Sequence, residues 1–154
     1  FDAAIRHWTE TMGVGPFYLI ENNLLGEGKY LGEPYHCVFS IAIAYWGDMQ
    51  IELVRQENDA PSIYRGREGE ALHHTCILTD DIVEARRIAE ESGAKVLVEG
   101  KVGENGHVLY VDTGAGPGTI VEILQSASGT DGLFAMIKAA SVGWDGKDPL
   151  RKLG

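Results

Sequence analysis

Residues 71–93, ALHHTCILTDDIVEARRIAEESG, carry the strongest fold signal in the chain. The apolar run LHHTCILT predicts a strand. The spacing from Asp81 to Glu84 then resembles a capping box at a helix start, with Asp in place of the usual Ser or Thr, and Gly93 supplies a stop. The stretch therefore predicts a strand followed directly by an amphipathic helix. The buried stripe of that helix is expected at the positions with helical spacing: Ile82, Ala85, Ile88 and Ala89.

The same plan occurs twice along the chain. After Gly93 come a short strand, AKVLVEG, and two strands joined by a turn, HVLYVDTG and TIVEILQ. A helical pattern at the start of the chain likewise ends at Gly13, and VGPFYLI, YHCVFSIAIAYW and MQIELVRQ follow it. The final strands are nearly alike, IELV and VEIL. This similarity indicates an internal repeat with a period of about eighty residues.

The two copies differ in length by ten residues. Glu52 lies 39 residues after Gly13, whereas Glu122 lies 29 residues after Gly93. We assign the excess to NNLLGEGKYL, which its glycines mark as an insertion rather than a regular element.

The repeat predicts an α+β fold of two tandem βαβββ modules that form a curved mixed sheet around a cleft. By the same offset, the opening strand of the first module would lie before Phe1 and is missing from this chain. The expected parts are a first module without its opening strand (1–58), a linker (59–70), a second module (71–126) and a C-terminal helix and tail (127–154).

Composition limits the classes of function. The formal net charge is −10, which disfavours nucleic-acid binding and attachment to anionic membranes. No apolar run reaches the length of a bilayer span, and no signal-peptide pattern opens the chain, so we expect a cytoplasmic protein. Cys37 and Cys76 lie in apolar strand-like runs, where buried free thiols are expected.

Two strand glutamates are the candidates for chemistry. Apolar residues flank both Glu52 and Glu122, and strand alternation turns these neighbours toward the helix of their own module. Each Glu then faces the other side of its sheet, at the same place in both repeats. Two carboxylates that converge in a cleft repel each other unless a proton or a cation lies between them. Of the adjacent His73 and His74, strand parity allows only one to join them, which would complete a divalent-metal set of Zn, Ni, Co, Mn or Fe.

This combination resembles the vicinal oxygen chelate superfamily, which includes glyoxalase I, methylmalonyl-CoA epimerase, extradiol dioxygenases and bleomycin-resistance proteins. The similarity is nearest to the epimerase and glyoxalase-like branch, with its strand ending ELL or ELI, its DxP loop, and G-L-H-H leading into DDI. Here the chain reads IELVRQENDAPSIY, then EGEALHHTCILTDDI, and downstream VEILQ.

The resemblance implies specific roles for three residues. It implies metal ligands at Glu52, His74 and Glu122, with a fourth ligand in the missing opening strand. It also implies Glu122 as the base that removes a proton α to a carbonyl, with Glu52 as the second candidate for that base. His73 is then expected on the opposite face of the strand, hydrogen-bonded or partly exposed.

The resemblance leaves three functions open. The first is a metal-dependent isomerase or epimerase that acts on an acyl-CoA ester or on a keto or hydroxy acid. The second is a glyoxalase-type lyase of the lactoylglutathione lyase kind or, as a lesser alternative, a ring-cleaving dioxygenase. The third is a metal-free protein that binds a small molecule and confers resistance. In each case the expected partners are a small-molecule ligand and a second copy of the chain in a homodimer.

Overall fold

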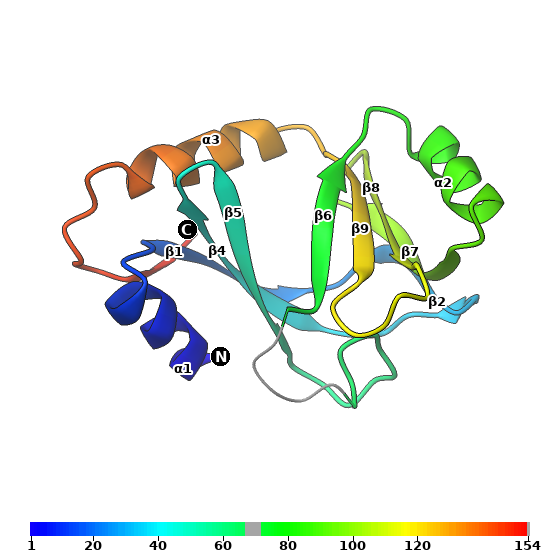
Figure 1. Cartoon of the computed structure of the whole chain (residues 1–154), viewed down its shortest axis with the longest axis horizontal. Coiled ribbons are helices and arrows are strands. Elements are labelled where there is room, and N and C mark those ends of the chain that lie inside the picture. The colour runs from blue at the N-terminus through cyan, green and yellow to red at the C-terminus, as the bar shows by residue number, and fades with distance from the viewer. Residues whose placement is uncertain (67–71, 154) are drawn as a thin grey trace. The chain divides into compact units, whose positions relative to one another are not determined.

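The computed structural model describes residues 1–66 and 72–153, and it is shown in Figure 1. These residues form two compact units, each built on one mixed β-sheet. Unit 1 comprises residues 1–23, 38–58 and 129–153, and unit 2 comprises residues 24–37 and the described part of 59–128. The predicted α+β class with mixed sheets is confirmed. The tandem arrangement of the modules around a cleft stays a prediction.

Unit 1 has a four-stranded sheet in the order β10-β1-β4-β5. Strand β10 runs parallel to β1, and the remaining pairs are antiparallel. Its elements are α1 (Asp2–Arg6), the π-helical turn η1 (His7–Thr11), β1 (Phe17–Asn23), β4 (Phe39–Trp46), β5 (Met49–Gln56), α3 (Thr130–Ser141) and β10 (Leu150–Lys152).

The core of unit 1 joins its N-terminal helical segment to one face of the sheet. Ile5 and Trp8 pack in one cluster with Ile51 and Leu53 of β5. Gly13 ends the helical segment with a φ of 66°, a left-handed conformation that glycine adopts without strain. The helix and the stop predicted from the sequence are therefore both present.

Unit 2 has a six-stranded sheet in the order β3-β2-β7-β8-β9-β6. Strand β6 runs parallel to β9, and the other pairs are antiparallel. Helix α2 lies against β7, β8 and β9 (Figure 1). The elements are β2 (Gly26–Tyr30), β3 (Glu33–Pro34), β6 (His74–Leu78), α2 (Ile82–Glu91), β7 (Lys95–Val102), β8 (Gly106–Asp112) and β9 (Ile120–Gln125).

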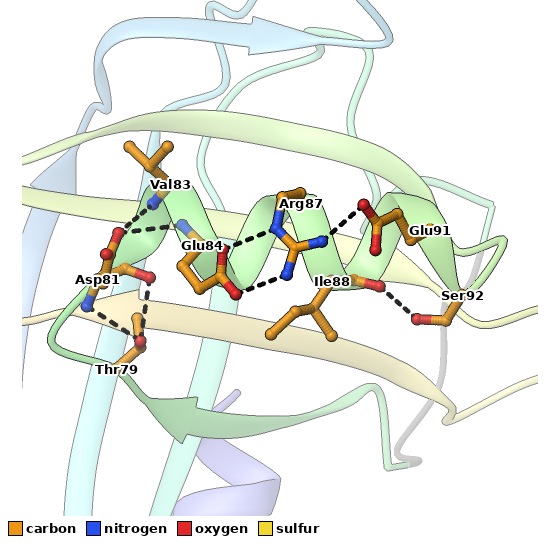
Figure 2. Close-up of polar contacts among 8 residues, drawn as sticks. All are labelled: Thr79, Asp81, Val83, Glu84, Arg87, Ile88, Glu91 and Ser92. Carbon is orange, nitrogen blue, oxygen red and sulfur yellow. Dashed lines mark hydrogen bonds and ion pairs between the residues drawn. The ribbon is translucent and has the colours of Figure 1, made fainter.

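The start of α2 follows the sequence prediction, with one exchange of partners. The Asp81 carboxylate accepts hydrogen bonds from the backbone N–H groups of Val83 (3.1 Å) and Glu84 (3.0 Å), as Figure 2 shows. In a full capping box Glu84 would reach back to the N–H of Asp81. Here the Thr79 hydroxyl accepts that N–H, and Glu84 pairs with Arg87. The predicted N-cap is therefore correct.

The buried face of α2 is narrower than predicted. Ile82, Ala85 and Ala89 pack in the cluster that also contains Leu109 and Val111 of β8 and Ile123 of β9. The prediction that Ile88 is buried is wrong, because its side chain is 53 % exposed. Helical spacing alone does not show how far around the helix the sheet extends.

The segment NNLLGEGKYL is not the irregular insertion that the sequence predicted. It contains β2, which pairs antiparallel with β7. Small residues permit this pairing: a Cβ added at Gly100 would lie 2.8 Å from the Cβ of Leu25, so β7 admits only glycine there without a shift. Gly26 and Gly28, which indicated a loop in the sequence, are also closely packed, because an added Cβ would lie 3.3 Å from the Cβ of Lys101 or of Leu25.

The remaining sequence boundaries have mixed outcomes. The predicted C-terminal helix is present as α3, and the tail that follows it adds the unpredicted strand β10 to unit 1. Residues 67–71, which include the end of the predicted linker and the first residue of the second module, lie outside the described residues. The module limits therefore stay predictions. Within the described chain, none of the helices has the length and apolarity that a membrane span requires.

The close approach of β2 to β7 predicts different effects of two glycine-to-alanine changes. Gly100→Ala forces Leu25 or the backbone to move and should lower the free energy of unfolding by about 1 to 3 kcal/mol. Gly132→Ala is the matched control, because nothing lies within 4 Å of its added Cβ and alanine favours a helix by about 1 kcal/mol. Urea denaturation measures both. Equal stability of the two variants would contradict the close packing of β2.

Candidate metal centre

His74 and Glu122 lie together within unit 2. Strands β6 and β9 are parallel and pair Cys76 with Glu122, so His74 lies two residues earlier on the neighbouring strand. The Nε2 atom of His74 is 3.3 Å from the Oε2 atom of Glu122. Their side chains are 9 % and 12 % exposed, which leaves both groups largely out of water. The sequence placed both residues in one site, and the structure brings them together.

Strand alternation directs Glu122 to the sheet face opposite α2. Val121 and Ile123, on either side of it, contribute to the cluster beneath α2. In unit 1, Ile51 and Leu53 likewise pack against the N-terminal helical segment. Glu52 between them therefore takes the face of its sheet that lies away from that segment. The predicted orientation of both glutamates relative to their own helices is confirmed.

Glu52 occupies in unit 1 the position that Glu122 occupies in unit 2. Each lies on the last strand of an antiparallel three-stranded set, β1-β4-β5 in one unit and β7-β8-β9 in the other. Glu52 pairs with Ile43, and Glu122 pairs with Tyr110. Within unit 2, His74 and Glu122 offer one imidazole and one carboxylate, donors that suit a divalent metal ion.

His73 is not on the opposite side of a strand from His74, so that prediction is wrong. Strand β6 begins at His74, and His73 lies in the preceding connection, where strand parity does not apply. The two imidazoles meet edge to face with ring centroids 5.2 Å apart, and their Nδ1 atoms are 2.9 Å apart. The Nε2 atom of His73 is 3.0 Å from the carbonyl oxygen of Ile63. The expectation that His73 is hydrogen-bonded is correct.

Two tyrosines beside the histidines were not predicted. The Tyr110 ring packs edge-on against His74 at 5.3 Å, and the Tyr64 ring lies 5.0 Å from His73. Strand alternation along β8 could have predicted the orientation of Tyr110. Leu109 and Val111 face α2, so Tyr110 between them must face the other side of the sheet. Tyr64 lies in a connection after β5, and no periodicity marked it.

His107 belongs to a different part of unit 2. It lines a shallow pocket beside α2, together with Glu27, Arg86, Glu99 and Lys101. Lys101 is paired with Glu27, and both Arg86 and Lys29 are paired with Glu99, so each carboxylate of this wall already faces a cation. Lys101 also holds the pKa of the Glu27 carboxyl below its usual range. These neutralised pairs make the pocket a poorer candidate for metal binding than the His74–Glu122 pair.

The spacing of the His74–Glu122 pair fits a shared cation. A bare imidazole nitrogen and a carboxylate oxygen at this distance repel each other, because both carry lone pairs, and a proton or a cation between them removes that repulsion. Two ligand atoms bound to one ion at about 2.1 Å each lie about 3.0 to 3.4 Å apart for angles between octahedral and tetrahedral. The observed 3.3 Å falls in that interval. The residues therefore fit a divalent metal ion without a change in their separation.

The two cysteines differ from each other, contrary to the prediction that both are buried. Cys37 is fully buried, whereas Cys76 on β6 is exposed, and neither is part of a disulfide. Burial raises the pKa of the Cys37 thiol, which reduces the thiolate fraction at neutral pH. The prediction of two free thiols is confirmed, and the predicted burial is correct only for Cys37.

Comparison with known proteins identifies a family. The family model for the glyoxalase/bleomycin resistance protein/dioxygenase superfamily matches residues 1–111. This match includes Glu52 and His74 and ends before Glu122. No curated protein matches the chain significantly.

The different surroundings of the two thiols predict their reactivity. In native protein at pH 8, an aromatic disulfide reagent should modify Cys76 rapidly and Cys37 only as the chain unfolds. Release of the coloured thiolate measures the number of fast thiols, which should be one per chain. Cys76→Ser should abolish the fast reaction. Two fast thiols in native wild-type protein would contradict the burial of Cys37.

Proposed function

The chain belongs to the glyoxalase/bleomycin resistance protein/dioxygenase superfamily, and on that premise we propose that it is a metal-dependent isomerase or epimerase. In this proposal His74, Glu122 and Glu52 hold one divalent metal ion. The reaction is removal of a proton from the carbon α to a carbonyl group, followed by return of a proton to that carbon.

The His74–Glu122 pair is the observation that carries the proposal. Both side chains are largely buried on the sheet face away from α2, and their facing atoms are 3.3 Å apart. A buried carboxylate without a bonded partner is costly, so pairs of this kind are common at functional sites. Glu52 supports the proposal through its equivalent position on β5 of unit 1.

The donor set favours a metal of intermediate hardness. One imidazole with two carboxylates suits Zn, Ni, Co, Mn or Fe(II) better than the all-oxygen sites typical of Ca²⁺ and Mg²⁺. When bound, such an ion supplies Lewis-acid stabilisation of the oxygen that becomes negative as an enolate forms.

We assign the proton transfer to a carboxylate of this chain. Glu122 takes the proton from the α-carbon, and the electron pair of the broken C–H bond moves into the bond to the carbonyl carbon, which gives an enolate. Glu52 is the second candidate for this base. Return of the proton from Glu122 to the same face restores the substrate, and inversion of the carbon requires a second acid that supplies a proton from the opposite face.

The apolar residues around the pair limit access of water. Tyr110, which pairs with Glu122 and packs against His74, is 6 % exposed. Ile120, which pairs with His74, is 1 % exposed. A partly dry site strengthens the interaction of a carboxylate base with the charge that develops on the substrate.

Members of the superfamily bind small molecules, and for this chain we propose a substrate with an acidic α-proton, such as an acyl-CoA ester or a keto or hydroxy acid. A homodimer stays a prediction.

Metal binding is the first test of this function. After removal of bound metal with a chelator, calorimetric titration with Zn²⁺ or Co²⁺ should give one site per chain. Glu122→Gln keeps the shape of the side chain but removes its charge. Loss of a residue that only hydrogen-bonds a metal ligand weakens metal binding about 10- to 100-fold, and loss of the Glu122 ligand itself should weaken it more than that. Glu104→Gln, in an exposed turn of unit 2, should bind metal as the wild type does.

Hydrogen exchange then separates the reaction from the binding. Metal-loaded wild-type protein in D₂O should replace the α-proton of a suitable CoA ester or hydroxy acid with deuterium, as observed by ¹H NMR. Glu122→Gln should slow this exchange by at least about 100-fold, the usual contribution of a general base. Stoichiometric metal binding without exchange of any candidate would favour a lyase, and the absence of metal binding would overturn the metal-dependent proposal itself.

A further inference from the structure

A chain of three polar contacts leads from a backbone carbonyl to the His74–Glu122 pair. The carbonyl oxygen of Ile63 is 3.0 Å from Nε2 of His73, Nδ1 of His73 is 2.9 Å from Nδ1 of His74, and Nε2 of His74 is 3.3 Å from Glu122. All four residues belong to unit 2. The contacts therefore form one continuous path inside a single compact unit.

The first acceptor in this path determines where the hydrogens lie. A carbonyl oxygen can only accept, so Nε2 of His73 must carry the hydrogen that it donates to Ile63. A neutral imidazole has one N–H, so Nδ1 of His73 is then an acceptor. The matching Nδ1 of His74 is then the donor. Nε2 of His74 directs its lone pair toward Glu122, and a cation between these two atoms removes the repulsion of their lone pairs.

The connection that carries Ile63 is itself held in place. The Ser62 hydroxyl accepts hydrogen bonds from the backbone N–H groups of Tyr64 (3.0 Å) and Arg65 (3.2 Å), which closes a turn around Ile63. The Ile63 side chain is 6 % exposed, and the Tyr64 ring packs on His73. These contacts fix the carbonyl and the ring that it bonds.

We propose that His73 is a positioning residue that holds His74 as the Nδ1–H tautomer, so that the bare Nε2 is presented to a divalent cation shared with Glu122. The inference rests on the proposed function only for the identity of the ligand. A metal-bound imidazole must offer a lone pair, and a hydrogen bond to its other nitrogen fixes the tautomer and the ring orientation. A neighbouring imidazole takes the place that a carboxylate or carbonyl group usually holds.

The competing arrangement is specific and measurable. If His73 instead donated from Nδ1, His74 would accept at Nδ1 and carry its hydrogen on Nε2, where it would bond to Glu122. That state blocks Nε2 as a ligand atom and leaves two acceptors, Nε2 of His73 and the Ile63 carbonyl oxygen, facing each other at 3.0 Å.

The tautomer can be read directly in metal-free wild-type protein. Long-range ¹H–¹⁵N correlation spectra distinguish a protonated from a bare ring nitrogen for each histidine, above the pH at which the rings are charged. We expect His74 to be protonated at Nδ1 and bare at Nε2, and His73 to be the reverse. The opposite pattern overturns the inference, whether or not the protein binds metal.

Two substitutions separate hydrogen bonding from packing. His73→Phe keeps a ring against Tyr64 but removes the acceptor, and it should mix the tautomers of His74 and weaken Zn²⁺ or Co²⁺ binding by about 10- to 100-fold. His73→Asn places a carbonyl acceptor near the former Nδ1 and should restore part of both properties. His107→Phe, in the pocket beside α2, is the matched control and should change neither property.

The outcomes distinguish this inference from the proposed function. If wild-type protein binds metal and His73→Phe binds it as tightly, with the tautomer of His74 unchanged, the role of His73 is wrong and the metal site stands. If wild-type protein shows the expected tautomers but binds no metal, the proposed function fails and the positioning of His74 by His73 stands. Circular dichroism of each variant confirms that it is folded before either comparison is made.

Discussion

The parallel pairing of β6 with β9 is the constraint on which the candidate site depends. Because Cys76 pairs with Glu122, His74 approaches Glu122 from the neighbouring strand, and alternation keeps Val121 and Ile123 under α2. A shift of one residue in β9 would turn Glu122 toward α2 and place an apolar side chain beside His74. The apolar cluster under α2 therefore fixes the register of β9, and that register places the Glu122 carboxylate beside His74.

The two units share a plan but extend it differently. In both, three antiparallel strands follow a helix, and an additional strand pairs with the first of the three. In unit 1 that strand is β10, from the end of the described chain. In unit 2 it is β2, which is the first strand of its sheet in sequence and comes after β1 and before β4 along the chain. Covering an edge strand in this way limits unwanted pairing, and the different origin of the two additions weakens the repeat in the sequence.

Sequence patterns predicted what depends on local periodicity and missed what depends on distant packing. The cap at Asp81 and the orientation of Glu52 and Glu122 relative to their own helices follow from short-range rules, and these predictions were correct. The role of β2 was missed because its partner strand β7 lies far away in sequence, where Gly26 packs close to Lys101. His73 was misplaced because strand parity was applied one residue before the strand begins. The partner of His73, the Ile63 carbonyl group, carries no side-chain signal at all.

The most direct test of the central claim, that His74 and Glu122 hold one divalent cation, is anomalous X-ray diffraction from crystals grown with Zn²⁺ or Co²⁺. The account predicts an anomalous peak within about 2.2 Å of both Nε2 of His74 and a carboxylate oxygen of Glu122. Glu52 is the expected third ligand. A peak bound through Nδ1 of His74, or a peak only at other residues in metal-saturated crystals, would contradict it.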